Sequence, residues 1–244
     1  MAIVSRYRTL KGIPRFLLVV STAFGIGLAA YYIFNIAFFD LMVMELGYHY
    51  LLIALFLPFA FLLLPFKKGD TASTPWYDVV LALLAFAAPF YLFLRANDVL
   101  LQGWAARAPI EGLVAGAILW FLPLEAARRA AGLPMTLIAL ILSLYPLFAP
   151  YMPGLLVGPP IDLDRLISYH AFSSESVLGI PMWSFGRIIV GYLVFASALL
   201  ATGGGQFFIN FALALLGHIR GGPAKVSVAA SALMGTLSGS SVVN

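Results

Sequence analysis

The polar residues best suited to chemistry gather at the end of the sequence, and they are Ser238, Gly239, Ser240, Ser241 and Asn244. Where a helix unwinds, its last carbonyl groups lose their intrahelical partners. Those carbonyls, together with serine hydroxyls and an asparagine amide oxygen, can replace the water shell of a small cation. Broken helices of this kind form ion and carboxylate sites in secondary transporters. A second interpretation stays open, in which the segment is only the end of a tightly packed helix.

The segment before these residues predicts the helix that carries them. Residues 223–237 begin with a proline, which suits the first turn of a helix, and are rich in small side chains. Ser227 and Ser231 have the four-residue spacing that permits close backbone packing in a membrane. The apolar stretch 206–217 comes earlier and, at roughly 12 residues, is too short to cross a bilayer. It predicts an interfacial or buried helix, joined to the next one by a glycine-rich basic turn.

The composition identifies the class of protein that must position these residues. Of the 244 residues, 62% are hydrophobic and 10% are charged, and the mean hydropathy is +1.00. A soluble domain of this size cannot bury so much apolar surface, and a disordered chain needs the opposite composition. The sequence has no cysteine, which excludes a disulfide framework, thiolate metal sites and cysteine nucleophiles. We therefore expect an all-α polytopic membrane protein.

Hydropathy predicts about six transmembrane helices, because a bilayer core of about 30 Å needs roughly 20 apolar residues per crossing. The first apolar stretch is longer than the apolar region of a cleaved signal peptide, so we expect it to remain as a membrane anchor. The expected spans are Phe16–Phe39, His49–Phe66, Trp76–Leu94, Ile110–Leu124 with an extension through Ala127, Pro134–Pro150, and about Leu178–Thr202.

The distribution of basic residues predicts the orientation of the chain. If the N-terminus is cytoplasmic, ten of the fourteen lysines and arginines fall on the cytoplasmic side, as positively charged loops generally do. The net charge of +4 then needs no nucleic-acid partner. The ten residues are Arg6, Arg8, Lys11, Arg15, Lys67, Lys68, Arg128, Arg129, Arg220 and Lys225.

The segment between the fifth and sixth spans, 152–177, is too polar to cross the membrane. Its apolar positions 163, 166, 167 and 170–172 have helical spacing. They predict a short amphipathic helix at the outer interface.

Four isolated polar features have simpler interpretations than a functional site. Asp78 is expected near the lipid headgroups, with a role in ion relay as the less favoured alternative. Asn35 is expected to make a hydrogen bond between helices. Arg187 is expected to extend its side chain outward, with anion binding as the alternative. The three histidines have no metal-binding spacing, and we expect no metal site.

An enzymatic role at the C-terminal serines is not favoured. The nucleophile elbow of serine hydrolases has the pattern Gly-x-Ser-x-Gly, whereas residues 235–239 place Ser238 one position too late. The expected function is therefore not catalytic.

Several stretches of the sequence resemble the large permease subunit of tripartite ATP-independent periplasmic (TRAP) transporters. The form it resembles is the fused small-plus-large permease that works with TAXI-type solute-binding proteins. The most specific stretches are GGQFFI (204–209), ALAL (212–215), RGGPAKV (220–226) and ASALMGTLSGSSV (230–242). Weaker similarity is found in PWYD (75–78), EAARRA (125–130), YMPG (151–154) and GIP (179–181).

The resemblance implies a permease of the bacterial inner membrane that imports organic anions with a sodium or proton gradient. A periplasmic binding protein would deliver the solute, and the transport region would move like an elevator against a scaffold. Residues 206–217 would correspond to an arm helix and 223–244 to the first half of a re-entrant hairpin. Ser238, Gly239, Ser240, Ser241 and Asn244 would then contact the cation or the substrate. No cofactor is implied apart from the coupling ion.

The resemblance also implies a division of the chain. Residues 1–130 would be small-subunit-like scaffold helices, and 131–244 would begin the large-subunit-like transport region. The family's permeases continue well past this point, so we expect an N-terminal piece that requires the remainder of the large subunit. The alternative is a scaffold that does not transport and assembles with a separate large subunit.

Overall fold

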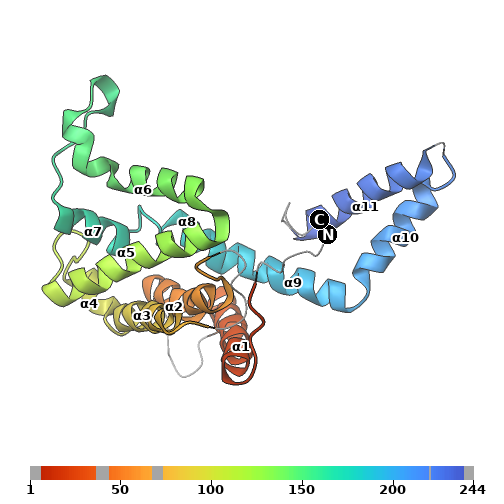
Figure 1. Ribbon diagram of the computed structural model, residues 1–244, viewed down its shortest axis with the longest axis horizontal. Coiled ribbons are helices and arrows are strands. Elements are labelled where there is room, and N and C mark those ends of the chain that lie inside the picture. Colours follow the sequence, from red (N-terminus) through yellow and green to blue (C-terminus); the bar gives the residue numbers. More distant parts are fainter. Residues whose placement is uncertain (1–6, 37–43, 68–73, 220, 239–244) are drawn as a thin grey trace. The chain divides into compact units, whose positions relative to one another are not determined.

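The computed structural model describes residues 7–36, 44–67, 74–219 and 221–238, with only the backbone described at 234 and 236–238. All regular structure in these ranges is helical, as expected, and it forms two compact units, Met1–Trp183 and Ser184–Asn244. The helices of the first unit are α1 (Ile13–Ile33), α2 (Glu45–Leu63), α3 (Trp76–Leu94), α4 (Ala96–Leu101), α5 (Ile110–Ala131), α6 (Leu133–Phe148) and α7 (Leu163–Phe172) (Figure 1).

The second unit contains the helices that precede the predicted cation site. The short helix α8 (Ile180–Ser184) ends at Ser184, which is the first residue of the second unit. The π-helical segment η3 (Phe185–Ile189) follows it. Next come α9 (Val190–Ala201), α10 (Gly204–Leu216) and α11 (Gly222–Ser238). In Figure 1, α10 and α11 form a hairpin at the blue end of the chain.

Six helical stretches in the described ranges are long and apolar enough to cross a membrane, which confirms the expected architecture. The third agrees residue for residue with the prediction, at Trp76–Leu94. The first span was predicted at Phe16–Phe39, whereas α1 begins at Ile13, beside Pro14, and ends at Ile33. Asn35 follows the helix with φ 48°, a left-handed conformation that asparagine tolerates well. It is an exposed residue after the helix end, so the expectation of an interhelical contact within the span was wrong.

The core of the first unit lies where α2, α3, α5 and α7 meet. Tyr50 of α2 is completely buried, and its hydroxyl donates a hydrogen bond of 2.7 Å to the carbonyl of Ala171 in α7. Leu92 of α3 and Leu119 of α5 complete the same apolar cluster. Figure 1 shows α2 and α3 side by side. These contacts place the start of α2 and the end of α3 at the same end of the unit as α7.

The predicted amphipathic helix at 163–172 is confirmed as α7. Its buried side chains include Leu166, Ile167, Ala171 and Phe172, which belong to the predicted apolar face. This face packs against α5 at Gly116, where an added Cβ atom would lie 3.0 Å from the Cβ of Ala171. The two helices thus approach closely at this point of α5, and a residue larger than glycine would require α7 to shift.

We expect Gly116→Val to lower the free energy of unfolding by about 1–3 kcal/mol, because overpacking forces α7 away from α5. The matched control is Gly27→Val on α1, where an added Cβ atom would meet nothing within 4 Å. The measurement is the denaturant midpoint of the purified chain in detergent, followed by tryptophan fluorescence. Equal losses of stability in the two variants would contradict the proposed close contact.

Candidate functional site

The predicted cation site lies almost entirely outside the described residues. Ser238 is the last residue of α11, and only its backbone is described. Gly239, Ser240, Ser241 and Asn244 fall in the part that the structure does not describe. Their contacts to a cation or substrate therefore stay a prediction, and the described structure contributes the hairpin that leads to them.

A tight glycine turn closes this hairpin. Gly221 has φ 75°, a conformation that glycine adopts at little cost. An added Cβ atom on Gly222 would lie 2.6 Å from the carbonyl oxygen of Gly217, so the turn leaves no space for a side chain. The helices α10 and α11 then pack through Ala212, Val226 and Ala230, all buried.

The packing face of α11 differs from the one expected. Val226 and Ala230 have the four-residue spacing of a close helix contact, but Ser227 and Ser231 are exposed. The hydroxyl of Ser227 donates a hydrogen bond of 2.9 Å to the carbonyl of Ala224 in the previous turn. The small residues of α11 thus form one face toward α10 and a second face that stays open within the described residues.

The helix α10 is short and carries large apolar side chains on its outer side. Its 13 residues extend about 20 Å at 1.5 Å per residue, less than the bilayer core of about 30 Å. Phe207, Phe211 and Leu215 lie on one helical ridge and are about half exposed. The rings of Phe207 and Phe211 stack with their centroids 6.1 Å apart. These features fit a helix that lies at the interface rather than one that crosses.

The most highly organised polar group in the first unit is a buried cluster centred on Asp78. Its carboxylate accepts a hydrogen bond of 2.6 Å from Nη1 of Arg8 and another of 2.7 Å from Nη1 of Arg129. The side chains of Asp78 and Arg129 are fully buried, and that of Arg8 is nearly so. Each arginine Nη1 also approaches a carbonyl oxygen in or just after the last turn of α2, Phe61 for Arg8 and Leu64 for Arg129.

A second carboxylate extends this cluster along α5. Glu125 accepts a hydrogen bond of 2.8 Å from Nε of Arg129 and two of 2.7 Å from the guanidinium of Arg128. The guanidinium of Arg128 also lies over the ring of Phe66, 4.4 Å from its centroid. We call these five charged side chains, Arg8, Asp78, Glu125, Arg128 and Arg129, the ion cluster.

The ion cluster corrects the expectation for Asp78. The expectation gave Asp78 no protein partner, whereas its side chain is 0% exposed and pairs with two arginines. A buried carboxylate without partners is strongly disfavoured, but two arginines and their hydrogen bonds compensate the burial. Asp78 therefore joins the N-terminal segment, the start of α3 and the end of α5 at one end of the unit.

A second polar group lies alongside the C-terminal half of α5, next to α6 and α7. A cavity of about 490 Å³ is lined by Trp120, Ser143, His170 and Ser176, together with apolar residues of α5 and α6. The ring of His170 stacks on Trp120, and its nitrogens lie 2.9 Å from the Ser143 carbonyl and 2.9 Å from the Ser176 hydroxyl. Both ring nitrogens thus have protein partners. Within the described ranges, no group of three or more His, Asp or Glu side chains is arranged for a metal ion.

The comparison with protein families identifies the C-terminal half of the chain. Residues 118–244 match the family described as the DctM component of tripartite ATP-independent periplasmic transporters. The chain belongs to this family. It is thus related to a membrane transport component, and the matched region begins inside α5 and contains both α10 and α11.

A curated relative supports this membership. The large permease protein of an ectoine/5-hydroxyectoine TRAP transporter from Ruegeria pomeroyi is 31% identical over 112 residues. The alignment covers 46% of this chain and 26% of the relative, so the chain spans about a quarter of the relative's length. No solved structure matches the chain.

The DctM match divides the ion cluster of this TRAP permease chain. Glu125, Arg128 and Arg129 lie inside the matched residues, whereas Arg8 and Asp78 lie before them. The helix α5 continues without interruption through position 130, the predicted boundary between small- and large-subunit-like parts. The division into compact units at 183 reflects packing, so the boundary at 130 stays a prediction.

Sequence reasoning missed the ion cluster as a unit, although one signal for it was present. The charge distribution assigned Arg8, Arg128 and Arg129 to one side of the membrane, and Asp78 and Glu125 lie at the ends of predicted spans that face the same side. Charges of both signs that share a side and adjoin apolar spans are candidates for pairing, because an unpaired charge there is costly. The sequence alone does not say which arginine meets which acid.

We expect Asp78→Asn to lower the free energy of unfolding by about 3–5 kcal/mol, because it removes the buried negative charge that Arg8 and Arg129 share. The matched control is Asp98→Asn, which removes an exposed ion pair with Arg95 and should cost less than about 1 kcal/mol. Unfolding of the purified chain by a denaturing detergent, followed by tryptophan fluorescence, measures both. Losses of similar size would show that the buried pairs contribute no more than a surface pair.

Proposed function

We propose that the chain forms part of the permease of a TRAP transporter that takes up organic anions, in particular carboxylates. Uptake is driven by a sodium or proton gradient and uses no ATP. A periplasmic solute-binding protein of the TAXI type delivers the solute, and the remainder of the large permease subunit completes the transport path. The observation that supports this function best is the α10–α11 hairpin within the region that matches the DctM family.

The hairpin provides a plausible physical basis for the coupling-ion site. Residues 238–241, Ser-Gly-Ser-Ser, favour a break in the helix, and where a helix unwinds its last carbonyl groups lose their intrahelical partners. We assign to Ser238, Gly239, Ser240, Ser241 and Asn244 the role of cation or substrate contacts. Hydroxyl, amide and carbonyl oxygens are suitable ligands for a small hard cation. In this proposal the hairpin moves with the transport region, like an elevator, against a scaffold.

The orientation proposed here puts the N-terminus in the cytoplasm of a bacterium, with the chain in its inner membrane. The ion cluster supports the charge-based argument, because it brings residues from three separate segments to one end of the first unit. Those segments are the N-terminal residues, the start of α3 and the end of α5. All three were assigned to the cytoplasmic side.

A role as a scaffold that does not transport is the second candidate. The self-contained packing of Met1–Trp183 favours it, because the ion cluster and the apolar core lie within this unit. In that case the chain would support a separately encoded large subunit without itself binding an ion. The uptake experiments below distinguish the two roles.

The first experiment tests secondary transport. A permease that includes this chain and the remainder of the large subunit is reconstituted into liposomes with its binding protein. We expect radiolabelled solute to accumulate when a sodium or proton gradient is imposed, and to stop when ionophores collapse the gradient. Ectoine and 5-hydroxyectoine, named for the relative, are reasonable first solutes alongside simple carboxylates. Accumulation that persists without gradients, or that requires ATP, would contradict the proposal.

The second experiment tests the residues at the hairpin tip in the same liposomes. We expect Ser240→Ala and Asn244→Ala each to raise the cation concentration for half-maximal uptake by about tenfold, as loss of about 1.4 kcal/mol of cation binding would produce. Ser227→Ala is the matched control, because its hydroxyl bonds its own helix. An unchanged cation dependence in both tip variants would remove these residues from the site and favour the scaffold role.

A further inference from the structure

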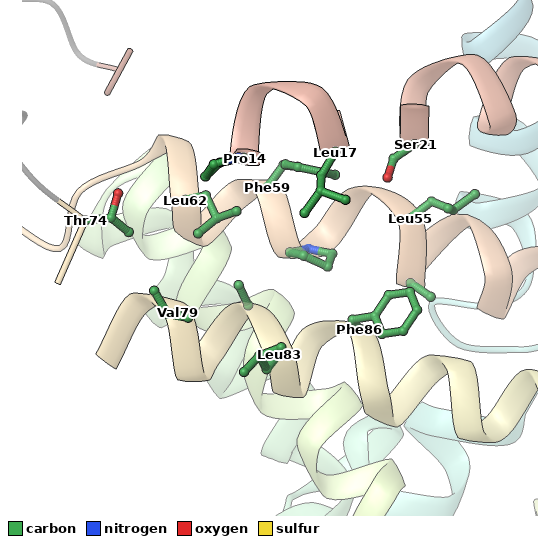
Figure 2. Close-up of a pocket in the computed structure, with 13 residues that line it drawn as sticks. Pro14, Leu17, Ser21, Leu55, Phe59, Leu62, Thr74, Val79, Leu83 and Phe86 are labelled. Atoms are coloured by element: carbon green, nitrogen blue, oxygen red, sulfur yellow. The ribbon is translucent and has the colours of Figure 1, made fainter. Parts of the chain in front are cut away.

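An apolar groove of about 440 Å³ lies between α1, α2 and α3 of the first unit (Figure 2). Its floor is α2, with the small buried residues Ala54 and Pro58. Its walls carry Leu17 from α1 and Leu83 from α3, both about half exposed. Among the residues that the structure describes, no side chain with a formal charge lines it. The three helices are long and apolar enough to cross a membrane, and in a bilayer this groove would lie at the depth of the hydrocarbon.

The groove is closed at one end by direct contact between α1 and α2. An added Cβ atom on Gly25 would lie 2.6 Å from the ring of Phe56, so the two helices touch there. Further along α1, Tyr32 stacks on Tyr48 with ring centroids 4.1 Å apart. The opposite end, at Pro14 and Thr74, is where the chain leaves the membrane spans (Figure 2).

The length of the groove corresponds to part of one lipid leaflet. Pro14 and Ser21 mark its extent along α1, and at 1.5 Å per residue they are about 10 Å apart along the helix axis. Half of a bilayer core is about 15 Å. The groove thus extends from the membrane surface toward, but not beyond, the middle of the bilayer.

Three basic residues lie close in the chain to the open end: Lys11 and Arg15 on either side of Pro14, and Lys67 after the end of α2. Lys11, Arg15 and Lys67 are exposed, and none of them forms an ion pair with the residues that the structure describes. The backbone N–H of Arg8 donates a hydrogen bond of 2.8 Å to the carbonyl of Leu63, which holds the N-terminal segment beside the end of α2. Three positively charged residues therefore belong to the segments that adjoin the open end of the groove.

We propose that this groove binds an anionic phospholipid, with an acyl chain between α1 and α3 and the phosphate near Lys11, Arg15 and Lys67. The apolar lining matches hydrocarbon, and the basic mouth matches the negative headgroup. This site does not depend on the proposed transport function. It would fix the separation of α1 from α3 at the end where the ion cluster lies.

A lipid fits the groove better than a further protein helix. Interfaces between membrane helices are rich in small residues that allow close approach. The exposed rim of this groove instead carries large side chains, among them Leu17, Leu83 and Phe86. A crossing helix would also need a contact surface along the whole bilayer, whereas the groove ends where α1 meets α2.

The test measures lipid binding to the purified chain by native mass spectrometry, using dioleoylphosphatidylglycerol and dioleoylphosphatidylcholine as probes. We expect tighter binding of the anionic lipid. Replacing Lys11, Arg15 and Lys67 together by Gln should weaken binding of phosphatidylglycerol about fivefold per basic residue and leave phosphatidylcholine unchanged. The matched control replaces Arg95, Arg107 and Arg165, which lie at the opposite end, by Gln.

A second pair of variants tests the groove itself. Leu83→Trp should fill it and weaken binding of both lipids, whereas Leu84→Trp, the next residue on α3, does not line the groove and should not. Circular dichroism and monodisperse elution confirm that each variant is folded. Equal effects of the two tryptophans, or of the two triple replacements, would overturn the proposal. It would also be overturned if the chain formed dimers that Leu83→Trp dissociates, since a protein would then occupy the groove.

Discussion

The burial of Asp78 between Arg8 and Arg129 is the constraint on which the first unit depends. A buried carboxylate is tolerated only when paired charges and hydrogen bonds replace its water, so its partners must be brought to it. Apolar helices in lipid have no hydrophobic force that pulls them together. Directional polar contacts can therefore decide which helix ends meet, and here they join the N-terminal segment, α3 and α5.

The helical architecture was predictable because the bilayer sets the length of each span. Trp76–Leu94 agrees with the prediction at both ends, since Pro75 and Arg95 flank the apolar residues. The end of α1 was not predictable from hydropathy, because apolar residues continue after Ile33 while Asn35 adopts a left-handed conformation that ends the helix. Hydropathy reports the preference for lipid, whereas a helix end depends on backbone conformation.

The candidate sites were predictable to different degrees, for physical reasons. The hairpin could be expected from its glycines and proline, since these residues restrict the backbone locally. The face of α11 that packs on α10 could not be predicted in the same way. Val226 and Ser227 are neighbours in the sequence, and the contact with α10 decides that Val226 is buried and Ser227 exposed. The ion cluster joins residues 8, 78 and 129, and such distant pairing depends on the packing of the whole unit. The roles given to Ser240 and Asn244 rest on their residue types and on the family resemblance, since both lie outside the described residues.

Each of the two units is stabilised internally by a different kind of contact, and this difference is relevant to the proposed transport. The ion cluster requires exact geometry, because displacing one arginine would remove a charged hydrogen bond from the buried carboxylate of Asp78. The described core of the hairpin consists of Ala212, Val226 and Ala230, which contribute non-directional contacts with little dependence on exact orientation. A scaffold needs a single arrangement, whereas a moving element must exchange one set of neighbours for another. Buried charges suit the first requirement and small apolar residues suit the second, which is the distribution found between the first unit and the α10–α11 hairpin.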